Sequence, residues 1–364
     1  MAQQRLLALM IVCYLLAAVV PRPGEALRAM VLGSGGSVTV PMVLLAVMLS
    51  TAGLGVRVRD LCAVAGRPLR PASGVAVNAL LPVVLLPVAA ICLRAWPDAA
   101  EAECLAVGLL LVLAMPIAGG AASWGQHAGG NVALVVAMVV GSTLLSPVTV
   151  PLGLAVSAAL VGPAGTGSLD DTARLDGLAA TAGAGAFALA LIVLPCLAGV
   201  VVRAMLGERR AARGTPVIKL VNIVNILLLC YINASGALGQ ALSHPDPDFL
   251  VLAAGMAGAV CCLSFLVGRW MSRWTRCDTP DGISLTFATG MNNTSAAAVL
   301  AASWFAHRPQ VLLPILAYSL LQKLAASVFG TRPPARHAAP SRALPRRLGD
   351  AYRRPATPGA RLDL

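Results

Sequence analysis

Two clusters of small and polar residues interrupt apolar stretches of this sequence and carry most of its potential for chemistry. Residues 115–123 read Met-Pro-Ile-Ala-Gly-Gly-Ala-Ala-Ser, and residues 288–295 read Ala-Thr-Gly-Met-Asn-Asn-Thr-Ser. Proline and glycine weaken a helix, so each cluster predicts a break in a helix. A broken helix within a membrane exposes backbone N–H and C=O groups that hold a solute or an ion. The clusters therefore indicate binding chemistry.

The candidate solute site consists of small and polar residues from both clusters. The start of a helix presents N–H groups and the positive end of the helix dipole, which favours an anion. The asparagine amides offer further hydrogen bonds to a solute, or else they tie the broken backbone together, and both roles can coexist. The predicted site residues are Gly119, Gly120, Ser123, Gly290, Asn292, Asn293 and Thr294.

Two titratable side chains are candidates for moving a proton or a charge together with the solute. His127 follows the first cluster and is a candidate to take a proton during a transport cycle, although a hydrogen-bonded structural histidine is the commoner case. Lys323 lies in the last apolar stretch, where a cation is costly unless it pairs, faces a cavity or snorkels, and its position favours snorkelling. The nine cysteines form no C-x-x-C pair, so the sequence predicts no metal site and no cofactor.

The elements that must hold these residues are membrane helices. Hydrophobic residues make up 58% of the chain and charged residues 12%, whereas a soluble domain carries about 25% charged residues. The net charge of +12 does not indicate nucleic-acid binding, because the arginines gather in loops and in the tail without interleaved aromatic residues. A helix needs about 20 apolar residues to span a lipid bilayer. Ten stretches qualify: 5–20, 35–56, 71–93, 104–124, 129–160, 177–202, 215–239, 249–268, 282–303 and 309–330.

The charges of the loops alternate and predict how these stretches are oriented. Arginines follow the second, sixth and eighth stretches and fill the tail, whereas acidic residues follow the third, fifth and seventh. By the positive-inside rule both termini are cytoplasmic, with Arg22 and Arg28 as exceptions. The predicted location is the plasma membrane, which is the inner membrane in a bacterium. The first stretch also resembles a cleavable secretory signal, but its removal would leave an odd number of spans.

The two clusters fall at matching positions in two halves of the chain. Gly120 and Gly290 are 170 residues apart (290 minus 120), about half of the membrane part. Each half holds five spans, an odd number, so the second half is inverted relative to the first. We therefore expect an all-α integral membrane protein of about ten transmembrane helices, built as two inverted five-helix repeats with broken fourth and ninth helices. The expected parts are a first repeat at 1–160, a second at 161–330 and a disordered basic cytoplasmic tail at 331–364.

Three motifs give the chain a resemblance to a known family. They are Gly-Asn-Val-Ala-Leu at 130–134, Ser-Thr-Leu-Leu-Ser-Pro-Val-Thr-Val-Pro at 142–151, and Gly-Met-Asn-Asn at 290–293. In these motifs the chain resembles the bile acid:sodium symporter family over roughly residues 5 to 330. The resemblance implies ten spans in inverted repeats, and uptake or exchange of an organic anion such as a bile acid, a keto acid or a related carboxylate, driven by sodium.

The resemblance also assigns sodium ligands, and this chain departs from them. In the family, sodium is held by a Ser-Asn pair after the fourth-helix break, by Ser and Thr on the fifth helix, and by an acidic residue with a glutamine around the ninth-helix break. The matching positions here are Ala121, Ala122, Val135, Val139, Ala288 and Asn292. Since sodium requires several oxygen ligands, we expect transport that does not depend on sodium in the ordinary two-ion manner. One loose sodium site, built from Asn292, Thr289 and freed carbonyls, remains the alternative.

Transport of a small organic anion across the lipid bilayer is thus the function that the sequence favours. An intramembrane enzyme would need a nucleophile with its base, an acidic pair or metal ligands, and the spans contain no such motif. A non-transporting receptor or scaffold would not need two matched helix breaks. Tight helix packing explains a single glycine pair, but two matched clusters favour a transport site.

Overall fold

The computed structural model describes residues 2–32, 38–56, 68–161, 183–243 and 246–330. The predicted tail at 331–364 lies outside the described residues, and so do the charged loops at 57–67 and 162–182 that entered the topology prediction. The described part is almost entirely helical, as the apolar stretches predict, with one short antiparallel hairpin that pairs Val31 with Thr39.

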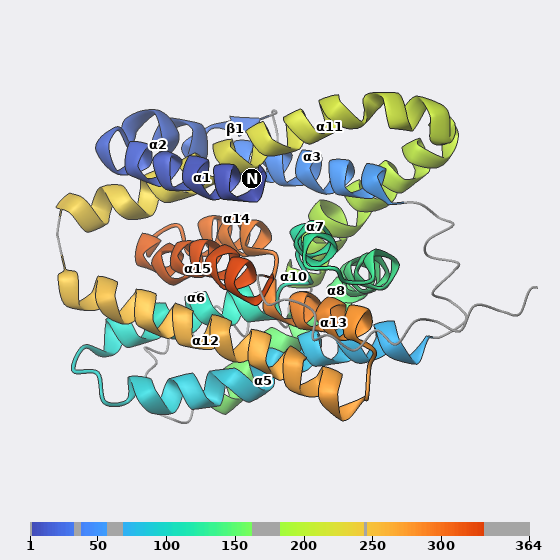
Figure 1. Ribbon diagram of the computed structural model, residues 1–364. Coiled ribbons are helices and arrows are strands. Elements are labelled where there is room, and N and C mark those ends of the chain that lie inside the picture. Colours follow the sequence, from blue (N-terminus) through green and yellow to red (C-terminus); the bar gives the residue numbers. More distant parts are fainter. Residues whose placement is uncertain (1, 33–37, 57–67, 162–182, 244–245, 331–364) are drawn as a thin grey trace, which may run out of the picture. The chain divides into compact units, whose positions relative to one another are not determined.

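The elements follow one another along the chain as a series of helices (Figure 1). In the first half they are α1 (Ala2–Val19), α2 (Arg22–Ala29), β1 (Val31–Leu32), β2 (Val38–Thr39), α3 (Val40–Gly55), α5 (Leu69–Leu93), α6 (Ala99–Ala114), α7 (Gly120–His127) and α8 (Val132–Val161). In the second half they are α10 (Gly183–Phe187), the π-helical turn η2 (Ala188–Val193), α11 (Leu194–Ser243), α12 (Pro247–Trp274), α13 (Thr279–Gly290), α14 (Thr294–Trp304), the 3₁₀ turn η3 (Pro309–Val311) and α15 (Leu312–Gly330).

Several helix starts carry the local signals that define them. The Asp98 side chain caps α6 by accepting hydrogen bonds from the amides of Ala100 (2.8 Å) and Glu101 (3.2 Å). The Asp246 side chain caps α12 in the same way, through the amide of Phe249 (3.0 Å). Both carboxylates also match the positive end of the helix dipole, so they fix where these two helices begin.

Six helices of the described part are long and apolar enough to cross a membrane, and the bent pair α1 and α2 makes a seventh candidate. The predicted stretches at 35–56, 104–124 and 282–303 are not among them. The first becomes the shorter helix α3, and the other two are broken into α6 with α7 and α13 with α14. The protein is therefore a mostly helical membrane protein with several spans. The ten-span inverted repeat remains a prediction.

The helices pack in two groups, which Figure 1 shows as separate layers. The first group consists of α1, α2, α3 and α11, and the second consists of α5 to α8 and α12 to α15. Within the second group α6 is buried on nearly all sides, including Leu105, Leu109 and Leu113. A helix that is apolar all round belongs in the interior of a bundle, and α6 leads directly to the first predicted break.

The outer face of the second group is apolar, as a lipid-facing surface must be. On α5 the exposed residues Leu80, Val84, Val88 and Ile91 recur every three or four positions. This spacing places them on one side of the helix, opposite the buried residues Leu86 and Ala89. Exposed apolar stripes of this kind fit contact with lipid chains.

Candidate functional site

The two predicted helix breaks cross each other in the interior. Ile117 and Asn292 form an isolated antiparallel bridge. The amide of Ala118 donates to the carbonyl of Met291 (2.8 Å), and the amide of Asn293 donates to the carbonyl of Pro116 (3.0 Å). Each break thus forms hydrogen bonds with backbone N–H and C=O groups of the other. In this way a broken helix avoids unpaired polar groups away from water. The two sequence clusters meet at one point, which we call the crossing.

The predicted site residues of the first cluster lie at an open helix start. Gly119 is the N-cap of α7, and no side chain caps the amides of its first turn. Gly119, Gly120 and Ser123 are all exposed. A side-chain carbon added at Gly119 would meet only Ala52 of α3, at 3.6 Å. The start of α7 therefore faces the boundary between the two helix groups and is accessible to an anion.

The predicted site residues of the second cluster are buried and largely satisfied within the protein. The Asn293 side chain caps α14 by accepting from the amide of Ala296 (3.1 Å). Gln322 Nε2 donates to Thr294 Oγ1 (3.2 Å). Gly290 lies against the ring of Phe265, and an added side-chain carbon there would come within 2.4 Å of that ring. A larger residue at Gly290 therefore disturbs packing, so it would not test solute binding separately from folding.

Asn292 is the exception, because its side chain is fully buried yet only partly paired. Its Oδ1 accepts a hydrogen bond from Asn78 Nδ2 of α5 (2.8 Å), whereas its Nδ2 has no partner among the described residues. The oxygen and nitrogen of an amide side chain can be assigned in either orientation. If both amides, of Asn78 and Asn292, are turned over, the hydrogen bond between them remains and one amide atom of Asn292 is still unpaired. An unpaired buried amide atom costs about 1–3 kcal/mol, so a solute group or water is expected to bind it.

The positions that the family resemblance assigns to sodium are packed as apolar core. Ala121, Val135 and Ala288 are completely buried in one hydrophobic cluster, and Ala122 and Val139 pack against it. Carbon atoms thus occupy the places where the family has oxygen ligands. The oxygen that does reach the first break belongs to Ser142 of α8, whose Oγ accepts from the amide of Ile117 (3.1 Å).

The two titratable candidates differ in their surroundings. His127 is exposed in the last turn of α7, with Nδ1 at 2.7 Å from the carbonyl of Ser123. Lys323 is half-buried, and its Nζ donates to the carbonyl (2.8 Å) and hydroxyl (3.3 Å) oxygens of Ser319. Its side chain therefore runs toward the start of α15, and the expected snorkelling to the membrane interface stays a prediction. Among the described residues Lys323 has no carboxylate partner.

Two buried carboxylates form ion pairs near the starts of α6 and α13, the helices that lead into the two breaks. Both lie just outside the apolar stretches that the sequence predicts. Asp281 of α13 accepts from Arg70 and from Asn131 Nδ2 (2.8 Å), and Asn131 immediately precedes α8. Glu103 of α6 accepts from Arg308 Nη1 (2.9 Å), and Arg308 immediately precedes η3 and α15. The helices that lead into the two breaks, α6 and α13, are thus each held by a buried carboxylate near their start.

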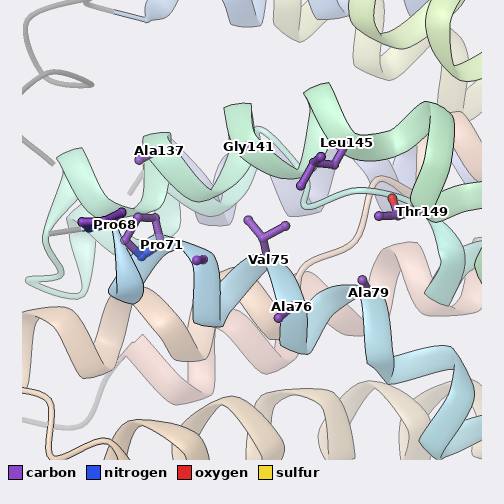
Figure 2. Close-up of a pocket in the computed structure, with 10 residues that line it drawn as sticks. Pro68, Pro71, Val75, Ala76, Ala79, Ala137, Gly141, Leu145 and Thr149 are labelled. Atoms are coloured by element: carbon purple, nitrogen blue, oxygen red, sulfur yellow. The ribbon is translucent and has the colours of Figure 1, made fainter. Parts of the chain in front are cut away.

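A separate groove of about 490 Å³ lies between α5 and α8, and Figure 2 shows its lining. Pro71, Val75, Ala76 and Leu145 form its walls, with Thr149 as a hydroxyl at one end. None of the predicted site residues lines this groove. Its apolar walls suit hydrocarbon rather than an anion.

A comparison of the sequence with protein families identifies the family. The sequence model of the Sodium Bile acid symporter family matches residues 42–244, which is more than half of the chain. The chain belongs to the sodium bile acid symporter family. Membership in this symporter family, together with the long apolar helices, makes the protein a multi-pass membrane transporter. The family match covers α3 to α11 and ends before the second break.

Two proteins of Bacillus subtilis (strain 168) are similar to the chain. "Uncharacterized protein YbaS" is 27% identical over 230 residues, which cover 61% of this chain and 67% of that protein. "Uncharacterized sodium-dependent transporter YocS" is 27% identical over 229 residues, which cover 62% of this chain and 64% of that protein. The chain thus spans about two thirds of the first relative and slightly less of the second.

Proposed function

We propose that this protein is a secondary transporter that carries a small organic anion, such as a bile acid, a keto acid or a related carboxylate, and that the solute binds at the crossing. The observation that carries the proposal is the backbone pairing of the two breaks around Asn292, whose buried amide has an unpaired atom. Broken helices at the centre of a transporter are where solutes bind.

The solute carboxylate binds between the open start of α7 and the polar side of the second break. Gly119 and Gly120 contribute the positive end of the α7 dipole. Lys323 contributes the counter-charge, since it is a half-buried cation with no carboxylate partner among the described residues. The second break is buried in this structure, so the group of α1, α2, α3 and α11 moves relative to the other group to expose it during transport.

Sodium coupling of the ordinary two-ion kind is absent in this proposal. The apolar packing of Ala121, Val135 and Ala288 supports this, because a sodium ion there would lack oxygen ligands. Coupling through a proton on His127, coupling through the charge of Lys323, and facilitated diffusion are the remaining routes. The half-buried position of Lys323 favours the second, whereas His127 is exposed and bonded within its own helix.

We further propose ten spans as two inverted repeats, with both termini cytoplasmic. In a cysteine-free version of the protein, a cysteine at the exposed Ala99 should react with an impermeant reagent from outside, and one at the exposed Arg210 should react only after permeabilisation. The position next to it, Ala211, is buried and would not report the side of the membrane. The reverse labelling pattern would overturn this orientation.

Uptake of labelled carboxylates by proteoliposomes tests the function. The wild type should accumulate at least one carboxylate above empty vesicles. Lys323→Gln should lower uptake by about tenfold or more, equivalent to about 1.4 kcal/mol, whereas Lys323→Arg should retain most of it because the charge remains. Equal uptake by wild type and Lys323→Gln would remove Lys323 from the site. Binding of a carboxylate without any uptake would favour a receptor.

A further inference from the structure

A basic pocket lies at the other end of α13, away from the crossing. It has a volume of about 320 Å³ and is bounded by the end of α12, the start of α13 and the end of α15. Arg269, Arg273 and Arg276 line it together with one carboxylate, Asp278. Arginine remains charged at all physiological pH values and binds phosphate oxygens in a fork. The lining therefore has the chemistry of a phosphate site.

The carboxylates of the described residues leave Arg273 and Arg276 of this pocket without an ion pair. Asp278 Oδ1 lies 3.4 Å from Arg70 Nη1, so its charge is shared with an arginine outside the pocket lining. Neither Arg273 nor Arg276 forms an ion pair with a carboxylate among the described residues. Asp278 is the N-cap of α13, but its side chain does not bond the first-turn amides, which leaves the positive end of the helix dipole available to an anion.

The surroundings place this pocket at the boundary between lipid and water. Trp270 and Trp274 on the last two turns of α12 are 61% and 71% exposed, and their rings stack at 5.9 Å. Exposed tryptophans at the end of a membrane helix lie at the level of the lipid headgroups. One turn earlier, Leu266 is exposed, as expected for hydrocarbon contact. The arginines therefore lie where headgroup phosphates are found.

The wall of the pocket is apolar on one side. Ile283 and Phe287 of α13 and Phe329 of α15 line it opposite the arginines. An inorganic phosphate gains nothing from such a wall, whereas a phospholipid carries its phosphate on an apolar body. Basic pockets between membrane helices bind anionic headgroups in this way.

We propose that this pocket binds the phosphate headgroup of an anionic phospholipid such as phosphatidylglycerol. Occupancy ties the ends of α12, α13 and α15 together on the side from which α13 leads to the crossing. The site depends on the charges of Arg273 and Arg276 and is independent of which solute the protein carries.

Thermal unfolding of the purified full-length protein in detergent tests the proposal. Phosphatidylglycerol should raise the unfolding temperature of the wild type by roughly 3 °C or more, because a ligand of the native state stabilises it. Phosphatidylcholine, which has no net charge, and inorganic phosphate should not. The double variant Arg273→Gln/Arg276→Gln should lose at least half of the shift.

The matched control is Arg210→Gln/Arg213→Gln, which removes the same charge from exposed positions on α11. It should keep the full shift. Equal shifts in the two double variants would overturn the pocket, as would a wild type that does not distinguish phosphatidylglycerol from phosphatidylcholine. An equal shift with inorganic phosphate alone would replace the lipid by a free anion.

If the pocket variant does not fold, native mass spectrometry of the wild type decides. Retention of phosphatidylcholine as readily as phosphatidylglycerol would contradict the proposal.

Discussion

The two breaks of this transporter pair with each other through their backbones but differ in chemistry. The first, between α6 and α7, is built from proline, glycine and apolar residues, and it opens into the exposed start of α7. The second, between α13 and α14, is polar and buried, and it is held by Asn78 and Gln322 from neighbouring helices. We propose that the two breaks have separate roles, in which the first break admits the solute and the second recognises it.

The largest effect is expected from removing the amide at the second break. Asn292→Leu keeps the branching at the γ carbon but replaces the amide by two methyl groups, and it leaves the buried amide of Asn78 without its partner, which costs about 1–3 kcal/mol. We expect a lower unfolding temperature and loss of measurable carboxylate uptake in proteoliposomes.

The double variant Asn78→Leu/Asn292→Leu separates the two effects. It removes both hydrogen-bond partners, so the cost of the unpaired Asn78 amide should disappear while uptake remains lost. Uptake at the wild-type rate in either variant would place the recognition site away from the second break.

An intermediate effect is expected from added bulk at the first break. An extra side-chain carbon at Gly120 would have only Met291 Cε near it, at 3.9 Å, so Gly120→Leu should fold normally. We expect carboxylate affinity to fall by about tenfold, or about 1.4 kcal/mol, because the side chain covers the open start of α7. Gly255→Leu on α12, where an added carbon meets nothing within 4 Å, is the matched control and should keep its affinity. If both variants bind alike, the first break does not admit the solute.

The smallest effect is expected from removing the hydrogen bond between Ser142 and the backbone of the first break. Ser142→Ala removes the acceptor of the Ile117 amide, which should lower the free energy of unfolding by about 1 kcal/mol. Because Ser142 contacts the first break and not the second, where the solute is recognised, uptake should stay close to that of the wild type. A loss of uptake as large as that of Asn292→Leu would show that the two breaks do not have separate roles.

The sequence predicts the positions of both breaks because proline, glycine and paired asparagines act locally. It does not reveal that Ile117 pairs with Asn292, since that contact joins residues far apart in the chain. Asn78 was missed for the same reason, although an isolated asparagine in an apolar stretch is a signal that a buried partner exists. The bond between Lys323 and Ser319 was not predicted either.

The apolar first break also explains why the family's name does not settle the energy source of this protein. At Ala121, Ala122, Val135, Val139 and Ala288 the chain has no side-chain oxygen to offer a cation, and these residues belong to or pack against the core. Sodium needs several oxygen ligands in a preformed cage. We therefore propose that Asn292 and Thr289 at the second break hold at most one ion, and only loosely.

Carboxylate uptake by proteoliposomes, with sodium outside and then with potassium or choline, is the most direct test of this account. The pH and the membrane potential must be held constant, so that only the identity of the cation changes. The apolar packing at Ala121, Val135 and Ala288 predicts the same initial rate with all three cations. Uptake that rises steeply and sigmoidally with sodium, and vanishes without it, would contradict the account.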